Sequence, residues 1–151
     1  MSQIEDICIF TIKGDKTVYN PQLKKRDKPL KSGGNNVSAQ CYGDFNDIGT
    51  KQYKKTYLFK QPTTLISYDK IRNGAIHPTQ KPIPLLEYLI NTYSNIGDTV
   101  LDNCMGSGSA GVSCVNTGRN FIGIELDENY FNIAKQRIEN ARKSLDIHNQ
   151  V

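Results

Sequence analysis

The stretch Thr99-Val-Leu-Asp-Asn-Cys-Met-Gly-Ser-Gly-Ser-Ala-Gly111 decides the fold of this chain of 151 residues. Its first three residues, Thr99 to Leu101, are β-branched or apolar and lead to Asp102, which predicts a short strand that stops at a glycine-rich loop. Small residues from Ser109 to Thr117 predict a tightly packed helix, and Gly118 is placed to cap its end in the left-handed conformation. The stretch therefore predicts a strand, a loop and a helix in immediate succession.

The flanking sequence extends this pattern in both directions. After Pro82, apolar residues recur at intervals of three and four up to Tyr93, which predicts a helix. Phe121 to Glu125 is the next predicted strand, and Asp127 is placed to cap a last helix. The apolar face of that helix is expected at Tyr130, Ile133, Ala134, Ile138 and Ala141, with Lys135, Arg137, Arg142 and Lys143 toward its negative end. The order of elements predicts an α/β fold with a parallel, doubly wound sheet.

Two carboxylates and a glycine loop are expected to meet at the carboxyl edge of this sheet. Asp102 ends the first strand, and Glu125 ends the second, 17 residues after Gly108. Glycine at positions 106 and 108 lets backbone amides approach a ligand closely, and the start of the helix attracts anionic groups. Glu125 can accept hydrogen bonds from a ribose diol. The pattern predicts an adenosine-containing ligand.

Three interpretations of this segment are open from the residues alone. A glycine-rich turn can simply pack, it can hold a dinucleotide, or it can hold S-adenosylmethionine. Asp102 directly before the loop would oppose a pyrophosphate, whereas it suits the cationic amino group of a methionine moiety. The residues therefore favour S-adenosylmethionine over a nicotinamide dinucleotide.

Three segments resemble the permuted amino-group DNA methyltransferases, which are mostly adenine-N6 and some cytosine-N4 enzymes. They are His77-Pro-Thr-Gln-Lys-Pro82, Asp102 with the loop Met105 to Ser109, and Gly118-Arg-Asn-Phe-Ile-Gly-Ile-Glu-Leu-Asp-Glu-Asn-Tyr-Phe131. The resemblance is close from residue 77 to 141 and weaker toward the N-terminus. It implies a Rossmann-like S-adenosylmethionine-dependent methyltransferase fold, with a sheet that is incomplete in this chain.

The resemblance also implies which residues hold the cofactor. The hexapeptide at residues 77–82 and the glycine loop would hold the methionine end, and Glu125 would hold the ribose. The expected cofactor-binding residues are His77, Thr79, Lys81, Asp102, Cys104, Met105, Gly106, Ser107, Gly108, Ser109 and Glu125. The pair Asn103-Cys104 stands where the family typically has Pro-Phe, so an aromatic contact with the cofactor is expected to be lost.

Residues 1–76 and residues 77–151 are expected to form two parts of different character. Residues 1–80 carry 13 Lys/Arg and 7 Asp/Glu, a net charge of +6, whereas residues 81–151 carry 6 and 8, a net charge of −2. We expect strands at 7–12 and 63–68 and a long mobile loop at about 13–55. Residues 77–151 would form the S-adenosylmethionine-binding βαβ unit.

The basic loop is the candidate DNA-binding segment. The resemblance places it in the target-recognition region, and its cations are Lys24, Lys25, Arg26, Lys28 and Lys31. Such a cluster suits a polyanionic partner. A solvated loop is the alternative, because neither a recognition helix nor an aromatic stacking platform is evident beside the charges.

The tetrapeptide that performs the chemistry in this family, Asp/Asn/Ser-Pro-Pro-aromatic, is absent, since the sequence has no Pro-Pro dipeptide. We therefore expect no catalytic residue in this chain, which alone would be inactive. The strands that carry and follow the tetrapeptide in the family sheet would also be missing, which exposes strand edges and apolar faces. A complementary N-terminal segment, a protein partner or a homodimer is expected to fill the gap.

Composition narrows the remaining choices. Besides a DNA methyltransferase, the sequence leaves open a non-catalytic remnant that binds cofactor or DNA, and an NAD-dependent oxidoreductase. The four cysteines show no Cys-x-x-Cys pair, so we expect buried free thiols and no metal. No apolar stretch approaches the ~18 residues of a membrane helix, and no basic and apolar leader follows Met1, so we expect a cytoplasmic protein without a membrane partner.

Overall fold

The computed structural model describes residues 5–12, 17–31, 56–69 and 74–148. These residues form two compact units. The hairpin unit comprises residues 22–31 and 56–64, and the α/β unit comprises the other described residues.

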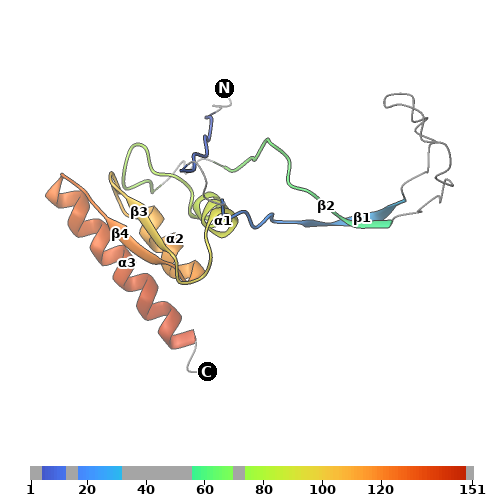
Figure 1. Ribbon diagram of the computed structural model, residues 1–151. Helices are drawn as coiled ribbons and strands as arrows, with labels where there is room; N and C mark the ends of the chain where they lie inside the picture. The colour runs from blue at the N-terminus through green and yellow to red at the C-terminus, as the bar shows by residue number, and fades with distance from the viewer. Residues whose placement is uncertain (1–4, 13–16, 32–55, 70–73, 149–151) are drawn as a thin grey trace, which may run out of the picture. The chain divides into compact units, whose positions relative to one another are not determined.

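Three helices and two strands make up the described part of the α/β unit (Figure 1). They are α1 (Ile83–Tyr93), β3 (Thr99–Asp102), α2 (Ser109–Thr117), β4 (Asn120–Gly123) and α3 (Glu128–His148). The strands pair in parallel, with Thr99 opposite Asn120 and Asp102 opposite Gly123. The predicted βαβ unit with a leading helix is therefore confirmed.

Local signals account for the ends of the helices. Pro82 is the extended residue before α1, where the lack of an N–H costs nothing. Gly118 ends α2 with a φ of +74°, and its N–H bonds back into the helix. Asp127 Oδ1 accepts hydrogen bonds from the N–H groups of Asn129 and Tyr130 at 2.9 and 3.0 Å, so it caps α3 as predicted.

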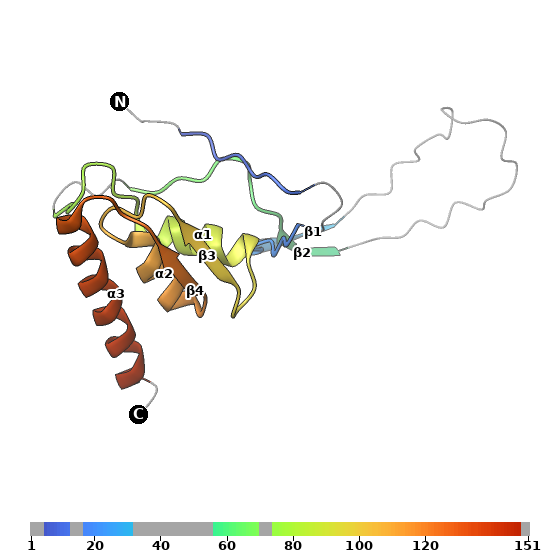
Figure 2. The same ribbon diagram turned by 60° about the vertical axis from the view of Figure 1, so that its left-hand side comes forward.

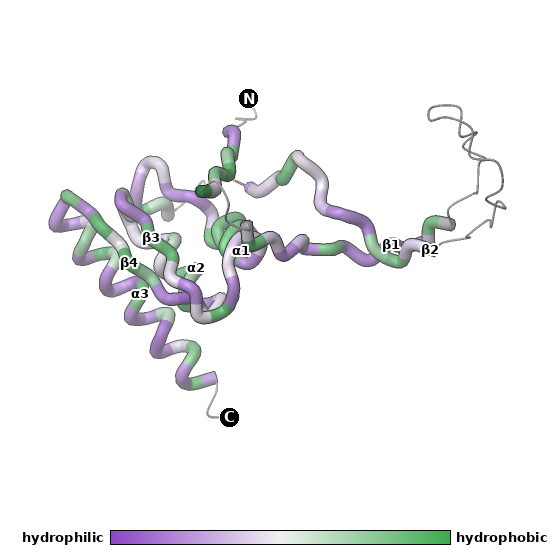
Figure 3. The backbone as a smooth tube through the Cα atoms, in the orientation of Figure 1, coloured by the Kyte–Doolittle hydropathy of each residue, from purple (hydrophilic) through white to green (hydrophobic). Residues whose placement is uncertain are grey.

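Helix α2 is the central element of the α/β unit, since it contacts α1, α3 and β4 (Figure 2). Gly111 makes this packing possible: a Cβ there would lie 2.3 Å from Ile138 Cδ1 and 2.8 Å from the Phe121 ring. Helix α3 alternates hydrophobic and hydrophilic stretches along its length (Figure 3), and Ala134 on its inner face is fully buried. The core therefore lies between the helices and one face of the strand pair.

The other face of the strand pair is apolar and open. Side chains alternate along β3 and β4, and the outward set includes Leu101, Ile122 and, just past the strand, Ile124. These three side chains are 62%, 54% and 55% exposed. Within the described ranges, nothing covers this face, which we call the open sheet face.

The hairpin unit consists of β1 (Lys24–Lys31) and β2 (Thr56–Lys60), which pair antiparallel. Lys24 lies opposite Lys60, and Leu30 lies opposite Tyr57, with an irregularity between these two stretches. The expectation of one loop at about 13–55 is therefore wrong for β1, because pairing with β2 satisfies its backbone groups. Residues 13–16 and 32–55 of that predicted loop lie outside the described residues.

The strands expected at 7–12 and 63–68 are also not found. Neither segment pairs with a strand in the described part of the chain. Phe10 and Ile12 are 88% and 78% exposed, and Leu65 is 72% exposed. A β-branched apolar run forms a strand only where a neighbouring strand and a packed face support it. By contacts, residues 65–69 and 74–76 group with the α/β unit, whereas the sequence suggested a division after residue 76.

Candidate functional site

The glycine loop, residues 103–108, connects β3 to α2 and is held by its own backbone. Met105 N–H donates to the carbonyl of Ile124 at 3.0 Å, which ties the loop to the end of β4. Gly108 N–H donates to the Met105 carbonyl at 2.8 Å and closes a tight turn. Met105 through Ser109 are all buried, so the loop forms part of the core as well as a surface.

Two glycines give the loop its shape. Gly106 and Gly108 have φ of +51° and +78°, which is the left-handed region that side chains disfavour. A Cβ on Gly108 would lie 2.7 Å from Ala134 Cβ and 2.9 Å from Ala134 Cα, so α3 could not approach. A Cβ on Gly106 would instead meet the ring of His77 at 3.4 Å. The loop is therefore enclosed between α3 and the segment that contains His77.

Three polar groups, two in this enclosed loop and one on the first residue of α2, lack an internal partner. The hydroxyl of Ser109 is buried without a hydrogen bond. Among the described residues, the carbonyl of Gly106 and the N–H of Ser107 also form no hydrogen bond, although both residues are buried. Buried polar groups are nearly always paired. The unpaired peptide between Gly106 and Ser107 therefore fits a site for a polar ligand.

Asp102 ends β3, as predicted, whereas Glu125 lies two residues beyond the end of β4 at Gly123. Glu125 Oε2 accepts a hydrogen bond from Gly106 N–H at 2.7 Å, and its other oxygen accepts from the N–H groups of Leu126 and Asp127 at 2.9 and 3.0 Å. These bonds, from Asp127 and Gly106 first, hold the pKa of Glu125 below its ordinary value. Asp102 Oδ1 accepts from Cys104 N–H at 3.1 Å. Both carboxylates are thus oriented by the loop itself.

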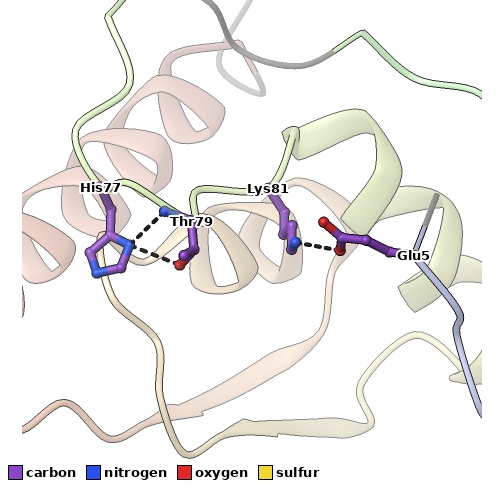
Figure 4. Close-up of polar contacts among 4 residues, drawn as sticks. All are labelled: Glu5, His77, Thr79 and Lys81. Carbon is purple, nitrogen blue, oxygen red and sulfur yellow. Dashed lines mark hydrogen bonds and ion pairs between the residues drawn. The ribbon is translucent and has the colours of Figure 1, made fainter. Parts of the chain in front are cut away.

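His77 lies against the glycine loop and is oriented by Thr79 and Tyr130. Thr79 N–H donates to His77 Nδ1 at 3.2 Å, and Thr79 Oγ1 lies 3.1 Å from the same nitrogen (Figure 4). The ring meets that of Tyr130 edge-on, with centroids 4.5 Å apart. Because Nδ1 accepts a hydrogen bond, a neutral ring carries its proton on Nε2. The sequence pattern placed Tyr130 only on the apolar face of the last helix, and missed this contact.

Lys81 points elsewhere. Its Nζ forms an ion pair with Glu5 Oε2 at 2.5 Å, and both side chains are exposed. Figure 4 shows His77 and Thr79 side by side, while Lys81 reaches toward Glu5. The structure therefore brings His77, Asp102 and Glu125 to the glycine loop but engages Lys81 with the N-terminal segment.

The cysteines differ from the expected buried thiols. Cys8 and Cys104 are exposed, and Cys41 lies outside the described residues. Cys114 is fully buried, and burial raises the pKa of its thiol to about 11, so it is an inert core residue. Cys104 lies in the glycine loop, where its N–H donates to Asp102 Oδ1.

Asn20 has a structural role in the α/β unit. Its side-chain amide donates to the carbonyls of Asn91 and Ser94 at 3.4 and 3.1 Å, and its N–H donates to the Thr92 carbonyl at 2.7 Å. These carbonyls lie at the end of α1, where the last turn lacks helical partners. Asn20 therefore fixes the N-terminal segment to α1.

The hairpin unit gathers the predicted cations with two aromatic rings. A hollow is lined by Lys25, Arg26, Asp27, Lys28 and Lys60. Tyr57 and Phe59 on β2 are 41% and 51% exposed, and the register puts Lys25 opposite Phe59. The aromatic residues next to the charges were missed from the sequence, because only strand pairing brings residues 24–31 and 56–60 together.

No group of three or more His, Cys, Asp or Glu able to hold a metal ion occurs in the described part of the chain. None of its helices is long and apolar enough to cross a membrane.

A glycine loop between two parallel strands, with a carboxylate at the end of each, defines the class of doubly wound domains that bind nucleotide-like cofactors. Within that class, the chain belongs to the DNA methylase family N6_N4_Mtase, whose model matches residues 2–136.

Curated relatives match a shorter part of the chain. The type II methyltransferase M2.DpnII of Streptococcus pneumoniae is 48% identical over 63 residues, which are 42% of this chain and 24% of that protein. The DNA adenine methyltransferase YhdJ of Escherichia coli strain K12 is 45% identical over 65 residues, which are 43% of this chain and 22% of that protein. The chain therefore spans about a quarter of the length of these relatives.

Among solved structures, the M1.HpyAVI–SAM complex is 40% identical to the chain, with a TM-score of 0.43. The match covers 62% of this chain and 43% of that one.

Proposed function

We propose that the chain is the cofactor-binding portion of a DNA methyltransferase that uses S-adenosylmethionine and modifies adenine at N6. The observation that carries the proposal is the unpaired, buried Gly106–Ser107 peptide, which lies in a loop between the carboxylates Asp102 and Glu125 in a chain of the DNA methylase family. A relative that is named an adenine methyltransferase supports the choice of adenine.

The loop residues suit the different parts of this cofactor. Asp102 carries the charge that a cationic amino group prefers, and Glu125 has oxygens that can accept from a ribose diol. Glu125 now accepts from Gly106 N–H, so ribose hydroxyl groups would exchange with or add to that contact. His77 closes the site over Gly106. When bound, S-adenosylmethionine supplies a methyl group on a positively charged sulfur.

The hairpin unit is the proposed DNA-binding element. Lys24 and Lys60 lie directly opposite each other, an arrangement of like charges that is unfavourable without an anionic partner. Lys25, Arg26, Lys28 and Lys31 add to the positive charge of β1. Phosphate contacts and stacking of bases on Tyr57 or Phe59 would favour binding to DNA.

Methyl transfer requires residues that this chain does not contain. The tetrapeptide that contacts the target amino group is absent from the sequence, and the open sheet face shows apolar side chains. We propose that a complementary segment, a protein partner or a second copy of the chain covers that face. The complementary segment or protein partner would also supply the catalytic groups. A monodisperse monomer with cooperative unfolding, measured by light scattering and urea titration, would contradict this part.

Two alternatives remain for the function. The first is a remnant that binds cofactor or DNA without catalysis. It differs from the proposed methyltransferase only in having no complementary segment that supplies the catalytic groups. An NAD-dependent oxidoreductase shares the glycine-rich fingerprint, but Asp102 would repel a pyrophosphate.

Isothermal titration calorimetry on the purified chain tests the proposal. We expect binding of S-adenosylmethionine and of its demethylated product, and none of NAD. Glu125→Ala should abolish the heat of binding, whereas Glu139→Ala, an exposed change on α3, should leave it intact. Absence of heat with millimolar S-adenosylmethionine would exclude the cofactor claim.

A further inference from the structure

We propose that Arg137 is a positioning residue of the cofactor site: its guanidinium fixes the glycine loop so that the Gly106–Ser107 peptide can bind the amino-acid end of the cofactor. The inference rests on the proposed function, since it concerns the same loop. The sequence pattern places Arg137 only among the cations toward the end of the last helix.

The contact is between α3 and the middle of the loop. Arg137 Nη1 donates a hydrogen bond to the carbonyl oxygen of Ser107. The side chain is half-buried, and burial lowers the pKa of its guanidinium. Of the carboxylates in the described ranges, none forms an ion pair with Arg137. Burying a cation costs free energy, which here is offset by a main-chain carbonyl of the loop.

The Gly106–Ser107 peptide lies between two peptides that are both fixed by hydrogen bonds, and Arg137 supplies one of these bonds. The peptide before it is fixed because Gly106 N–H donates to Glu125 and the Met105 carbonyl accepts from Gly108. The peptide after it is fixed because Gly108 N–H donates to Met105 and the Ser107 carbonyl accepts from Arg137. Between them, the Gly106 carbonyl and the Ser107 N–H have no partner among the described residues.

This loop needs such a restraint. Gly106 and Gly108 flank Ser107, and a residue without a Cβ moves between left- and right-handed backbone conformations at little cost. Helix α3 limits that freedom twice: Gly108 packs directly on Ala134, and Arg137, one turn further along the same face, binds the Ser107 carbonyl. The orientation of the free peptide therefore follows the position of α3.

The chemistry of the free peptide specifies which ligand group it recognises. The Gly106 carbonyl accepts hydrogen bonds, so it suits an ammonium group, and the Ser107 N–H donates, so it suits a carboxylate. The methionine end of S-adenosylmethionine carries both groups, and its adenosine end carries neither. The effect of Arg137 on binding should therefore fall on ligands that possess the amino-acid end.

Calorimetry with two ligands tests this inference. S-adenosylhomocysteine has the amino-acid end, and 5′-methylthioadenosine lacks it. We expect Arg137→Met to weaken the first by about tenfold or more, as loss of a charge-assisted hydrogen bond predicts, and to leave the second within about twofold. Arg137→Lys should restore part of the loss. Arg142→Met, an exposed change on the same helix, should bind both ligands like the wild type.

Either of two results overturns the inference. The first is that Arg137→Met binds S-adenosylhomocysteine with wild-type affinity. The second is that Arg137→Met loses affinity for both ligands equally, which indicates a general loss of structure. If the wild type binds neither ligand, the proposed function fails, and amide hydrogen exchange in the ligand-free chain decides the role of Arg137. Arg137→Met must then speed exchange at Gly108 N–H, and Arg142→Met must not; unchanged exchange in Arg137→Met contradicts the role.

Discussion

The glycine loop and the hairpin unit are each stabilised by different interactions. Residues 105–108 of the loop are buried, and they are restrained by the two glycines, by the carboxylate of Glu125 and by helix α3. In the hairpin, the described residues of β2 are all exposed and the charges lie along the strands. A change in the loop should therefore cost stability, while a change in the hairpin should alter interactions with a partner and leave stability intact.

The largest effect on stability is expected at Gly108. Gly108→Ala adds a Cβ that would lie 2.7 Å from Ala134 at a φ of +78°, so it combines strain with overpacking and should lower the free energy of unfolding by about 3 kcal/mol. Gly97→Ala is the matched control, because its φ is +86° but nothing lies within 4 Å of the added atom. That change should cost about 1 kcal/mol. Urea unfolding measures both, and equal losses would refute the role of close packing.

Substitution of one arginine in each unit compares how much a side chain contributes to stability in the two units. Arg119 donates to Ser94, Asn91 and Thr117, so it joins the end of α1 to the turn after α2. Arg119→Ala should reduce the free energy of unfolding by about 2 kcal/mol. Arg26 makes one hydrogen bond to the Phe59 carbonyl in the hairpin, and Arg26→Ala should change stability by less than about 0.5 kcal/mol. Similar losses in thermal unfolding would remove the distinction between the units.

The third prediction concerns pH. The pKa of Glu125 is lower in the folded chain than its ordinary value, so the carboxylate stabilises the fold above the unfolded pKa, about 4.3, and this contribution disappears as the pH falls through the folded value. Glu125→Gln should therefore be less stable than the wild type at pH 7 and approach it at pH 3. Glu139→Gln is the control. A stability difference that is constant between these pH values would contradict the account of Glu125.

The smallest effect on stability is expected in the hairpin. Lys25→Gln with Lys28→Gln should leave the free energy of unfolding within about 0.5 kcal/mol of the wild type. The same double change should reduce the slope of log affinity for duplex DNA against log salt concentration by about 2, since two phosphate contacts are lost. Lys135→Gln with Lys143→Gln on α3 serves as the control. An unchanged slope, measured by fluorescence anisotropy, would exclude these lysines from the DNA surface.

Much of the α/β unit could be predicted because its signals are local. A glycine at the end of α2, an aspartate before α3 and an apolar run at residues 99–102 act on neighbouring residues in the chain. The same holds for the glycine loop and for Glu125, whose place follows from the end of its strand. Local chemistry sets these features whatever lies further away.

The rest depends on contacts between residues distant in the sequence. The hairpin was missed because pairing between residues 24–31 and 56–60 has no local mark in a run of lysines. Lys81 has the right charge for a ligand carboxylate, yet Glu5 is near enough to bind it. The contact of Arg137 could not be predicted because its partner is the main-chain carbonyl of Ser107, and a main-chain group is not marked by any residue type in the sequence.

The open sheet face should affect the steady-state abundance of the protein in the cell. Leu101, Ile122 and Ile124 form an apolar surface beside strands with few paired neighbours, a combination that favours aggregation and recognition by chaperones and proteases. The complementary segment or partner proposed above would protect the chain from both. With that proposed partner, the steady-state amount of the protein should follow the supply of the partner more closely than the rate of its own synthesis.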